Sequence, residues 1–241
     1  MTLRHILISL AALVTGAAAA AAAPAAGPGK PDLEAIRAAS VDESSPYYYP
    51  RLLREFMRND TTSMDTRAFQ YFYYGTLFQE DYDPYRPPVD PATLERITPL
   101  FNKKSWTRAE RKQILDYAME SLADNPVNLR QLTNRIFVYE QNGKYDLAKI
   151  WQYKLNRLLL VIASSGTGLD PENAWTVVYP HDEYDFLNLS GITAREQRYE
   201  PPHYDYIVVN PKTPTSPKGY YFNIGELLRQ YYLKHPSESA E

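Results

Sequence analysis

The sequence contains no cysteine among its 241 residues. Disulfide bonds, thiol catalysis, iron–sulfur clusters and cysteine zinc sites are therefore excluded. Histidine is scarce, with four residues, and a net charge of −3 offers no basic surface of the kind that binds nucleic acid. Hydrophobic residues make up 44% of the chain and charged residues 23%. These fractions are typical of a globular protein with a buried core, so a disordered chain and a multi-span membrane protein are excluded.

Long apolar runs are confined to the N-terminus. Arg4 precedes an apolar run from Ile6 to Leu13, and an alanine tract from Ala17 to Ala23 follows. This order predicts a secretory signal peptide over residues 1–23, followed by a linker at 24–31. We therefore expect an exported, soluble protein, periplasmic or extracellular, without stable membrane insertion. A retained membrane anchor is the alternative, but the alanine, serine, threonine and glycine in the run weaken anchoring.

Helical periodicity and helix caps continue from residue 32 to residue 168. Thr107 and Glu110 have the spacing of a capping box, in which each side chain accepts from the backbone amide of the other residue. Apolar residues recur on one face of each segment, as in amphipathic helices. Helices are expected at 32–39, 50–58, from 65, from 90–91, and at 107–123, 129–139 and 146–164.

The texture of the sequence changes after residue 168. Strands are expected at 175–179, 204–209 and 220–223, and a short final helix at 225–234. The segment 184–189 fits either a strand or a helix. Helices followed by strands predict an α+β fold. In this fold the helical region 32–168 and an antiparallel sheet region 169–236 pack together as one unit.

One segment has the spacing of a known helical repeat. Tyr139, Gly143, Tyr145 and Ala148 follow the pattern of a tetratricopeptide repeat across its inter-helix turn. The small Ala148 would let two helices approach closely. The match covers one unit and no second copy is visible, so an ordinary helical hairpin is the alternative.

A broader resemblance covers the chain from Asp32 to about Leu228. It rests on the segments 45–50, 59–62, 73–82, 153–156, 164–168, 174–175, 182–185 and 218–223. These segments resemble the domain-of-unknown-function family 4919, a family of exported proteins of Bacteroidetes-type bacteria. The resemblance implies export and no assigned activity, and it transfers no catalytic residue.

Tyrosine is abundant, with 21 residues, and eight of them lie between residues 47 and 85. Exposed tyrosines beside acidic residues can stack on sugars or anchor a protein partner. We therefore predict a non-catalytic binding module for a peptide, protein or glycan. Packing of the tyrosines in the core is the alternative. The candidate binding residues are Tyr74, Asp81, Tyr82, Asp83 and Tyr85.

The richest polar stretch begins at His181. A histidine among the carboxylates Asp182, Glu183 and Asp185 can perform general acid–base catalysis or bind a metal. The alternative function is therefore a hydrolase or metal-dependent enzyme using His181. A turn between two strands with solvated acids explains the same residues without any activity. No HExxH or G-x-S-x-G motif is present, and we predict neither a metal nor a cofactor.

Overall fold

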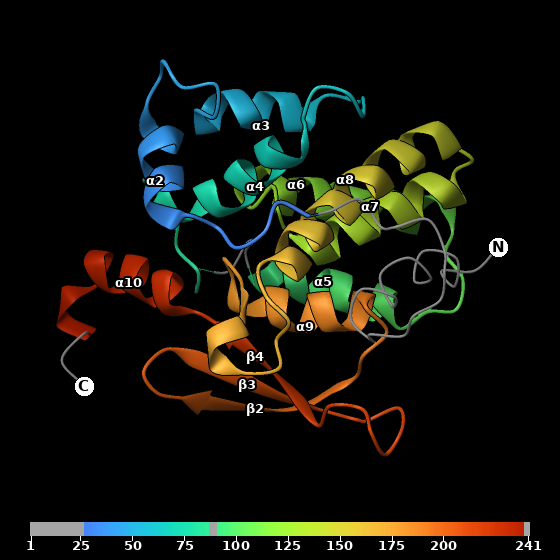
Figure 1. The fold of residues 1–241 in the computed structure, drawn as a ribbon. Coiled ribbons are helices and arrows are strands. Elements are labelled where there is room, and N and C mark those ends of the chain that lie inside the picture. Colours follow the sequence, from blue (N-terminus) through green and yellow to red (C-terminus); the bar gives the residue numbers. More distant parts are fainter. Residues whose placement is uncertain (1–26, 87–90, 239–241) are drawn as a thin grey trace, which may run out of the picture.

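The computed structural model describes residues 27–86 and 91–238 of the chain (Figure 1). The predicted signal peptide at 1–23 and Asp90, predicted to open a helix, lie outside the described residues. The α-helices are α2 (Leu33–Val41), α3 (Tyr49–Met57), α4 (Thr66–Gly75), α5 (Pro91–Phe101), α6 (Arg108–Asp124), α7 (Leu129–Gln141), α8 (Tyr145–Ser164), α9 (Pro180–Leu189) and α10 (Gly225–Lys234). Short 3-10 helices lie at Thr76–Phe78, Pro171–Asn173 and Pro236–Glu238.

Side-chain caps set where several helices begin. The Asp65 carboxylate accepts from the Ala68 amide at 2.7 Å, one residue before α4. The capping box predicted at Thr107 is confirmed, since the Glu110 amide donates to its Oγ1 at 3.2 Å and Glu110 Oε2 accepts from the Thr107 amide at 2.8 Å. Each cap satisfies an amide that has no partner within its helix.

The strands are β1 (Trp175–Thr176), β2 (Ala194–Glu200), β3 (Tyr204–Val209) and β4 (Gly219–Asn223), which form one sheet in the order β1-β4-β3-β2. The pairs β2–β3 and β3–β4 are antiparallel. The short β1 runs parallel to β4, with Trp175 opposite Phe222. The predicted α+β fold is therefore confirmed, but the sheet is mixed and not purely antiparallel.

The segment after β1 departs from its predicted structure. Only two residues of the strand predicted at 175–179 pair in the sheet. The chain then enters α9 at Pro180, so the ambiguous segment 184–189 is helical. The prediction of a turn with solvated acids at 181–185 is wrong, because Asp182 and Glu183 are fully buried. A strand at 194–200 had no counterpart in the sequence analysis.

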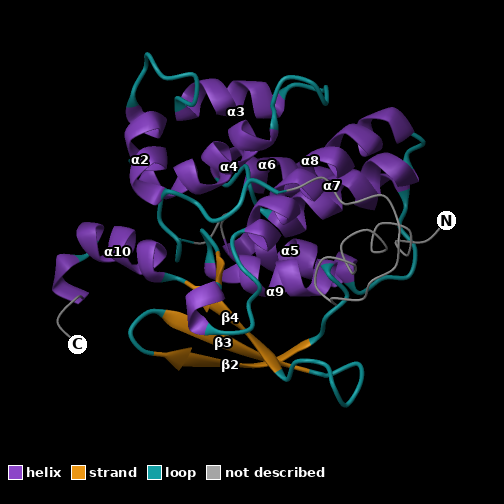
Figure 2. Ribbon diagram, in the orientation of Figure 1, coloured by secondary structure: helices purple, strands orange, loops and turns teal. Residues whose placement is uncertain are grey.

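The helices cover one face of the sheet, with α9 between the sheet and the helical body (Figure 2). Phe56 stacks on Phe72 at 4.6 Å between ring centroids and meets Trp151 edge-on at 5.8 Å. One hydrophobic cluster runs from these rings in the helices to Ile207 and Phe222 in the sheet. In the part of the chain that the structure describes, no helix is long and apolar enough to cross a membrane.

The hairpin of α7 and α8 lies where the repeat-like spacing falls. Gly143 has a φ of +71°, which favours glycine at this turn, and Ala148 is buried. These features suit a tight hairpin of two helices. The tetratricopeptide likeness itself stays a prediction.

Candidate functional site

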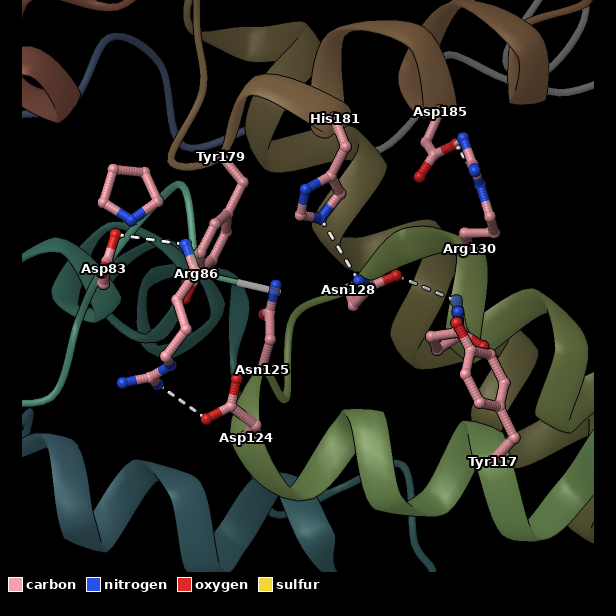
Figure 3. A pocket seen from close by; sticks show the side chains of 12 residues that line it. Asp83, Arg86, Tyr117, Asp124, Asn125, Asn128, Arg130, Tyr179, His181 and Asp185 are labelled. Atoms are coloured by element: carbon pink, nitrogen blue, oxygen red, sulfur yellow. Dashed lines mark hydrogen bonds and ion pairs between the residues drawn. The ribbon is translucent and has the colours of Figure 1, made fainter. Parts of the chain in front are cut away.

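A cleft of about 220 Å³ opens where three segments meet: the 83–86 loop, the turn between α6 and α7, and the start of α9 (Figure 3). We call it the α9 cleft. Its lining is polar and aromatic, and it carries charges of both signs. The lining residues are Asp83, Pro84, Arg86, Tyr117, Asp124, Asn125, Asn128, Arg130, Gln131, Tyr179, His181 and Asp185.

The first turn of α9 sends neighbouring side chains in different directions. Pro180 occupies the first helical position, where its missing N–H costs no helix hydrogen bond. His181 faces the cleft and leaves 35% of its side chain exposed, whereas the side chain of Asp182 is 0% exposed. The cleft histidine therefore has a buried carboxyl group directly behind it.

Asp182 is held by donors from two elements. The Tyr73 hydroxyl of α4 donates to its Oδ2 at 2.6 Å, and the Tyr179 amide approaches the same oxygen at 3.3 Å. The other oxygen, Oδ1, has no hydrogen-bond partner among the described residues and lies 3.8 Å from His181 Nε2. Burial raises the pKa of Asp182 to about 8, against the lowering effect of the Tyr73 hydrogen bond. Asp182 is therefore mostly protonated at neutral pH.

His181 is a neutral imidazole at neutral pH. Burial, and then the positive charge of Arg130, lower its pKa to about 4. Its Nε2 lies 3.3 Å from the Asn128 amide nitrogen, which is a donor, so Nε2 accepts this bond and Nδ1 carries the proton. The ring also stacks on Tyr179 with 5.2 Å between centroids. Figure 3 shows His181 and Asn128 pointing toward one another across the cleft.

Two ion pairs bound the cleft. Arg130 of α7 donates to Asp185 Oδ1 through Nε at 2.9 Å and Nη2 at 2.6 Å. Arg86 of the loop binds Asp124 at the end of α6 at 2.7 Å. Burial raises the pKa of Asp185, and Arg130 opposes that rise. Each arginine therefore has a fixed carboxylate partner, although both retain further N–H donors.

The turn between α6 and α7 supplies amide side chains in fixed positions. Asn128 caps α7, its Oδ1 accepting from the Gln131 amide at 3.0 Å. Asn125 Oδ1 accepts from the Val127 amide at 3.2 Å. Because the oxygens are committed to the backbone, the side-chain NH₂ groups are oriented as donors. The cleft therefore presents preorganised hydrogen-bonding groups.

A smaller pocket of about 70 Å³ adjoins the α9 cleft and shares Arg86, Asp124 and Tyr179 with it. Its other lining residues are Tyr49, Leu53, Thr76, Gln79, Asp81, Tyr82, Ala123 and Pro126. The ring of Tyr179 therefore forms a common wall. A ligand group in one pocket would lie close to a group in the other.

The structure brings residues from both sequence hypotheses to this one place. Asp83, His181 and Asp185 line the α9 cleft, and Asp81 and Tyr82 line the adjoining pocket. The two sets were predicted as alternatives, one for binding and one for catalysis, and they lie about 100 positions apart in the sequence. The geometry makes them neighbours.

Tyr74 and Tyr82, two of the candidate binding residues, are buried, as in the alternative in which the tyrosines pack in the core. Tyr74 is 0% exposed and donates its hydroxyl to the Thr176 carbonyl at 3.2 Å, while Tyr82, 3% exposed, donates to the Val178 carbonyl at 2.5 Å. The hydroxyls of Tyr73, Tyr74 and Tyr82 therefore all form hydrogen bonds with the segment that leads into α9 or with its first turn. Tyr85 is 51% exposed, but its ring meets Tyr231 edge-on at 4.8 Å and does not line the cleft.

Glu183 turns away from the cleft toward the sheet. In the described part of the chain, no N–H or O–H group donates to either of its oxygens, and its carboxyl group lies against that of Asp205 in β3. Burial, and then the charge of Asp205, raise the pKa of Glu183 well above its usual range. Two adjacent carboxyls resist joint ionisation, so this pair retains a proton at neutral pH. Glu183 belongs to the contact between α9 and the sheet.

Sequence reasoning missed most residues of the cleft, among them Asn125, Asn128, Arg130 and Tyr179. The Asp124-Asn125-Pro126 segment was interpreted only as a helix end. Asn128 has the residue type of a helix cap before the 129–139 stripe, which was the one available signal. Among the described residues, no group of three histidine or acidic side chains is arranged to hold a metal ion.

Comparison with known proteins gives one match. The family model described as "Domain of unknown function (DUF4919)" matches residues 34–233 and confirms the resemblance found in the sequence. Neither the curated proteins nor the solved structures that were searched contain a match.

Proposed function

The chain belongs to the DUF4919 family, and we propose that it is a non-catalytic binding protein that holds one sugar unit of a glycan in the α9 cleft. The observation that carries the proposal is the cleft lining. Amide donors, two paired arginines, aromatic rings and the free lone pairs of carboxylates surround one small space. These groups are held in place before any ligand arrives, which reduces the cost of binding.

The chemistry of the lining favours a neutral, hydroxyl-rich ligand. Each sugar hydroxyl both donates and accepts a hydrogen bond, and each sugar ring has an apolar face that can lie on an aromatic side chain. Asn128 and Arg130 supply donors, and Asp124, whose side chain is 36% exposed, supplies a carboxylate acceptor. A strongly anionic ligand would compete with Asp185 and Asp124 for their arginines. Peptides and proteins, the other predicted ligands, are therefore less well matched to this cleft.

The size of the cleft limits what it can hold. Drug-sized ligands occupy pockets of about 300–1,000 Å³. The 220 Å³ of the α9 cleft suits a single small group, and the adjoining 70 Å³ can take a substituent. One sugar ring of a longer chain meets this limit, with the rest of the glycan outside.

The protonation states favour binding over the rival hydrolase. An effective general base or acid has a pKa near the working pH. His181, with a pKa of about 4, is a weak base at neutral pH and has almost no protonated form available as an acid. Asp182, with a pKa of about 8, would suit a general acid, but its side chain is 0% exposed and does not line the cleft, so it cannot reach a ligand. The unpartnered Asp182 Oδ1 behind His181 is the one feature that supports the hydrolase.

The proposal also places the protein outside the cytoplasm. The signal peptide predicted over residues 1–23 supports export to the periplasm or the extracellular space. Glycans are abundant in both settings. Without cysteine, the protein has no disulfide bonds to stabilise it there.

The test is a binding screen followed by one matched substitution. The purified protein is applied to arrays of neutral oligosaccharides and of peptides, and affinity for the best probe is measured by calorimetry. Asn128→Asp keeps the oxygen that caps α7 but removes the amide donor to the cleft. We expect glycan binding that weakens about tenfold in this variant, the loss of roughly one hydrogen bond to a ligand.

Tyr145→Ala is the control, since Tyr145 is 62% exposed at the start of α8 and outside the cleft. Its affinity should equal that of the unchanged protein. Binding of peptides alone would overturn the glycan assignment. If the unchanged protein instead cleaves the glycan, and the His181→Ala variant does not, the hydrolase would be established.

A further inference from the structure

Among the residues that the structure describes, the polar strand at the outer edge of the sheet has no neighbour on one side. β2 is the last strand in the order β1-β4-β3-β2, so one of its edges pairs with β3 and the other does not pair within the described chain. The residues from Arg195 to Tyr199 are all exposed. Figure 2 shows β2 at the margin of the sheet, away from the helices. Such an edge offers backbone hydrogen bonds to another chain.

The hydrogen bonds of β3 identify the backbone groups at this free edge. The Val209 amide donates to the Lys218 carbonyl at 2.9 Å, toward β4, and the Asn210 amide donates to the Thr193 carbonyl at 3.1 Å, toward β2. Backbone groups alternate between the two edges of an antiparallel strand. The backbone N–H and C=O groups of the even-numbered residues of β3 therefore point toward β2. The backbone groups of their β2 partners, Glu196 and Arg198, point back toward β3.

It follows that the N–H and C=O groups of Gln197 and Tyr199 point outward from the sheet. We propose that this edge pairs with β2 of a second copy of the chain. The two strands run antiparallel about a two-fold axis at Gln197, and the sheets of the two copies join into one. This is an isologous contact, in which each copy gives and receives the same bonds.

The charges along β2 select this register. With the axis at Gln197, Glu196 lies opposite the partner's Arg198, and Arg198 lies opposite the partner's Glu196. Opposite charges at directly facing positions stabilise a strand pair and like charges destabilise it. A shift that places the axis at Arg198 sets this arginine against the partner's Arg198 and Glu196 against the partner's Glu200. The Gln197 axis pairs unlike charges on both sides. An axis at Tyr199 also does so, setting Arg198 against the partner's Glu200, but it places Gln197 opposite the partner's Pro201, which has no N–H to donate.

The same two side chains already form an ion pair within one copy. Arg198 Nε lies 2.8 Å and Nη2 3.1 Å from the Glu196 carboxylate oxygens. They project from the sheet face opposite α9, because Gln197 between them turns toward the helix, where it accepts from the Tyr184 hydroxyl at 3.1 Å. In the dimer, two glutamates and two arginines form one alternating network on this open face.

The contact is short. An irregularity in register between Ala194 and Glu196 leaves a regular stretch from 196 to 200. A few backbone bonds and exposed ion pairs give a weak association, since each exposed pair contributes about 0–1 kcal/mol. We therefore expect a dimer that forms with rising concentration and weakens with added salt.

The experiment is sedimentation velocity on the purified protein over a concentration series, with two single charge reversals. Glu196→Arg and Arg198→Glu each place like charges opposite one another in a homodimer. Each variant alone should remain monomeric where the unchanged protein dimerises. An equimolar mixture of the two variants should recover the dimer, because every facing pair across the mixed contact is then unlike.

Recovery in the mixture also shows that both variants are folded, so loss of the dimer in each alone cannot be attributed to misfolding. A single variant that still dimerises would overturn the proposal, since the contact would then lie elsewhere. So would an unchanged protein that stays monomeric up to its solubility limit. In that case the charges on β2 serve to keep the edge unpaired.

Discussion

Asp182 and Glu183 are adjacent acids on one helix, both 0% exposed, yet they serve opposite sides of α9. Asp182 accepts from the Tyr73 hydroxyl and lies behind the cleft histidine. Glu183 faces a second acid, Asp205, in the sheet. Burial raises the pKa of both acids. Their neighbours differ, since Asp182 contacts the Tyr73 hydroxyl and Glu183 contacts the Asp205 carboxyl group. The comparison shows that the partner of a buried acid, and not its burial, indicates whether it lies beside the α9 cleft or in the contact with the sheet.

The largest expected loss of stability follows removal of the Asp182 carboxyl group, which accepts two buried hydrogen bonds. Asp182→Ala leaves the Tyr73 hydroxyl and the Tyr179 amide without an acceptor in the core. We expect the free energy of unfolding to fall by about 2–4 kcal/mol, since each unsatisfied buried donor costs about 1–3 kcal/mol. Urea unfolding measures the loss.

Asp182→Asn is the matched control, because its amide oxygen can accept the same bonds. This variant should lose much less stability than Asp182→Ala at pH 6.5. Equal losses in the two variants would show that the hydrogen bonds of Asp182 do not stabilise the fold.

The second prediction concerns pH. Glu183 and Asp182 have raised pKa values, about 8 for Asp182, so the folded protein holds protons that the unfolded chain has released above pH 4–5. Stability must therefore fall as pH rises toward 8. His181 acts in the opposite direction, since its pKa falls from 6.5 to about 4, but that contribution ends near pH 6.5.

The pH range in which His181 does not contribute to the slope is therefore 6.5 to 8. Glu183→Gln should make the fall in stability across this window less steep, because it removes a group whose pKa is raised on folding. Urea unfolding at several pH values gives the slope. A variant with the same slope as the unchanged protein would mean that Glu183 is ionised in the folded state.

The third prediction compares two tyrosines that the sequence could not separate. Tyr82→Phe removes a buried hydroxyl that donates to the Val178 carbonyl and should cost about 1 kcal/mol. Tyr85→Phe, at a half-exposed ring, should change the free energy of unfolding by less than about 0.5 kcal/mol. Thermal unfolding of both variants checks the order, and a larger loss for Tyr85→Phe would contradict the assignment of Tyr82 to the core.

The parts of the fold that the sequence predicted correctly depend on local signals. The Asp65 cap, the capping box at Thr107 and the final helix at 225–234 all involve residues within one turn of one another. β2 had no such signal. It is an exposed edge strand, so its sequence from Arg195 to Glu200 lacks the apolar alternation by which half-buried strands are recognised.

The site shows the same limit. His181 and Asp83 were identified as candidates because of their residue types and neighbours in the chain. Asn128 and Tyr73 were not, since their importance comes from contacts with His181 and Asp182 across 53 and 109 positions. No spacing in the sequence records such contacts. The tertiary structure was needed to join two rival sets of candidates into one cleft.

The most direct test of the central claim is NMR of the histidine side chains during titration with the glycan probe found on the arrays. The imidazole signals of His181 should move as the cleft fills, while those of His203 and His235, which do not line it, stay in place. In the free protein, His181 should titrate with a pKa of about 4. Binding that leaves the His181 signals unmoved would show that the glycan occupies another site and would contradict the account.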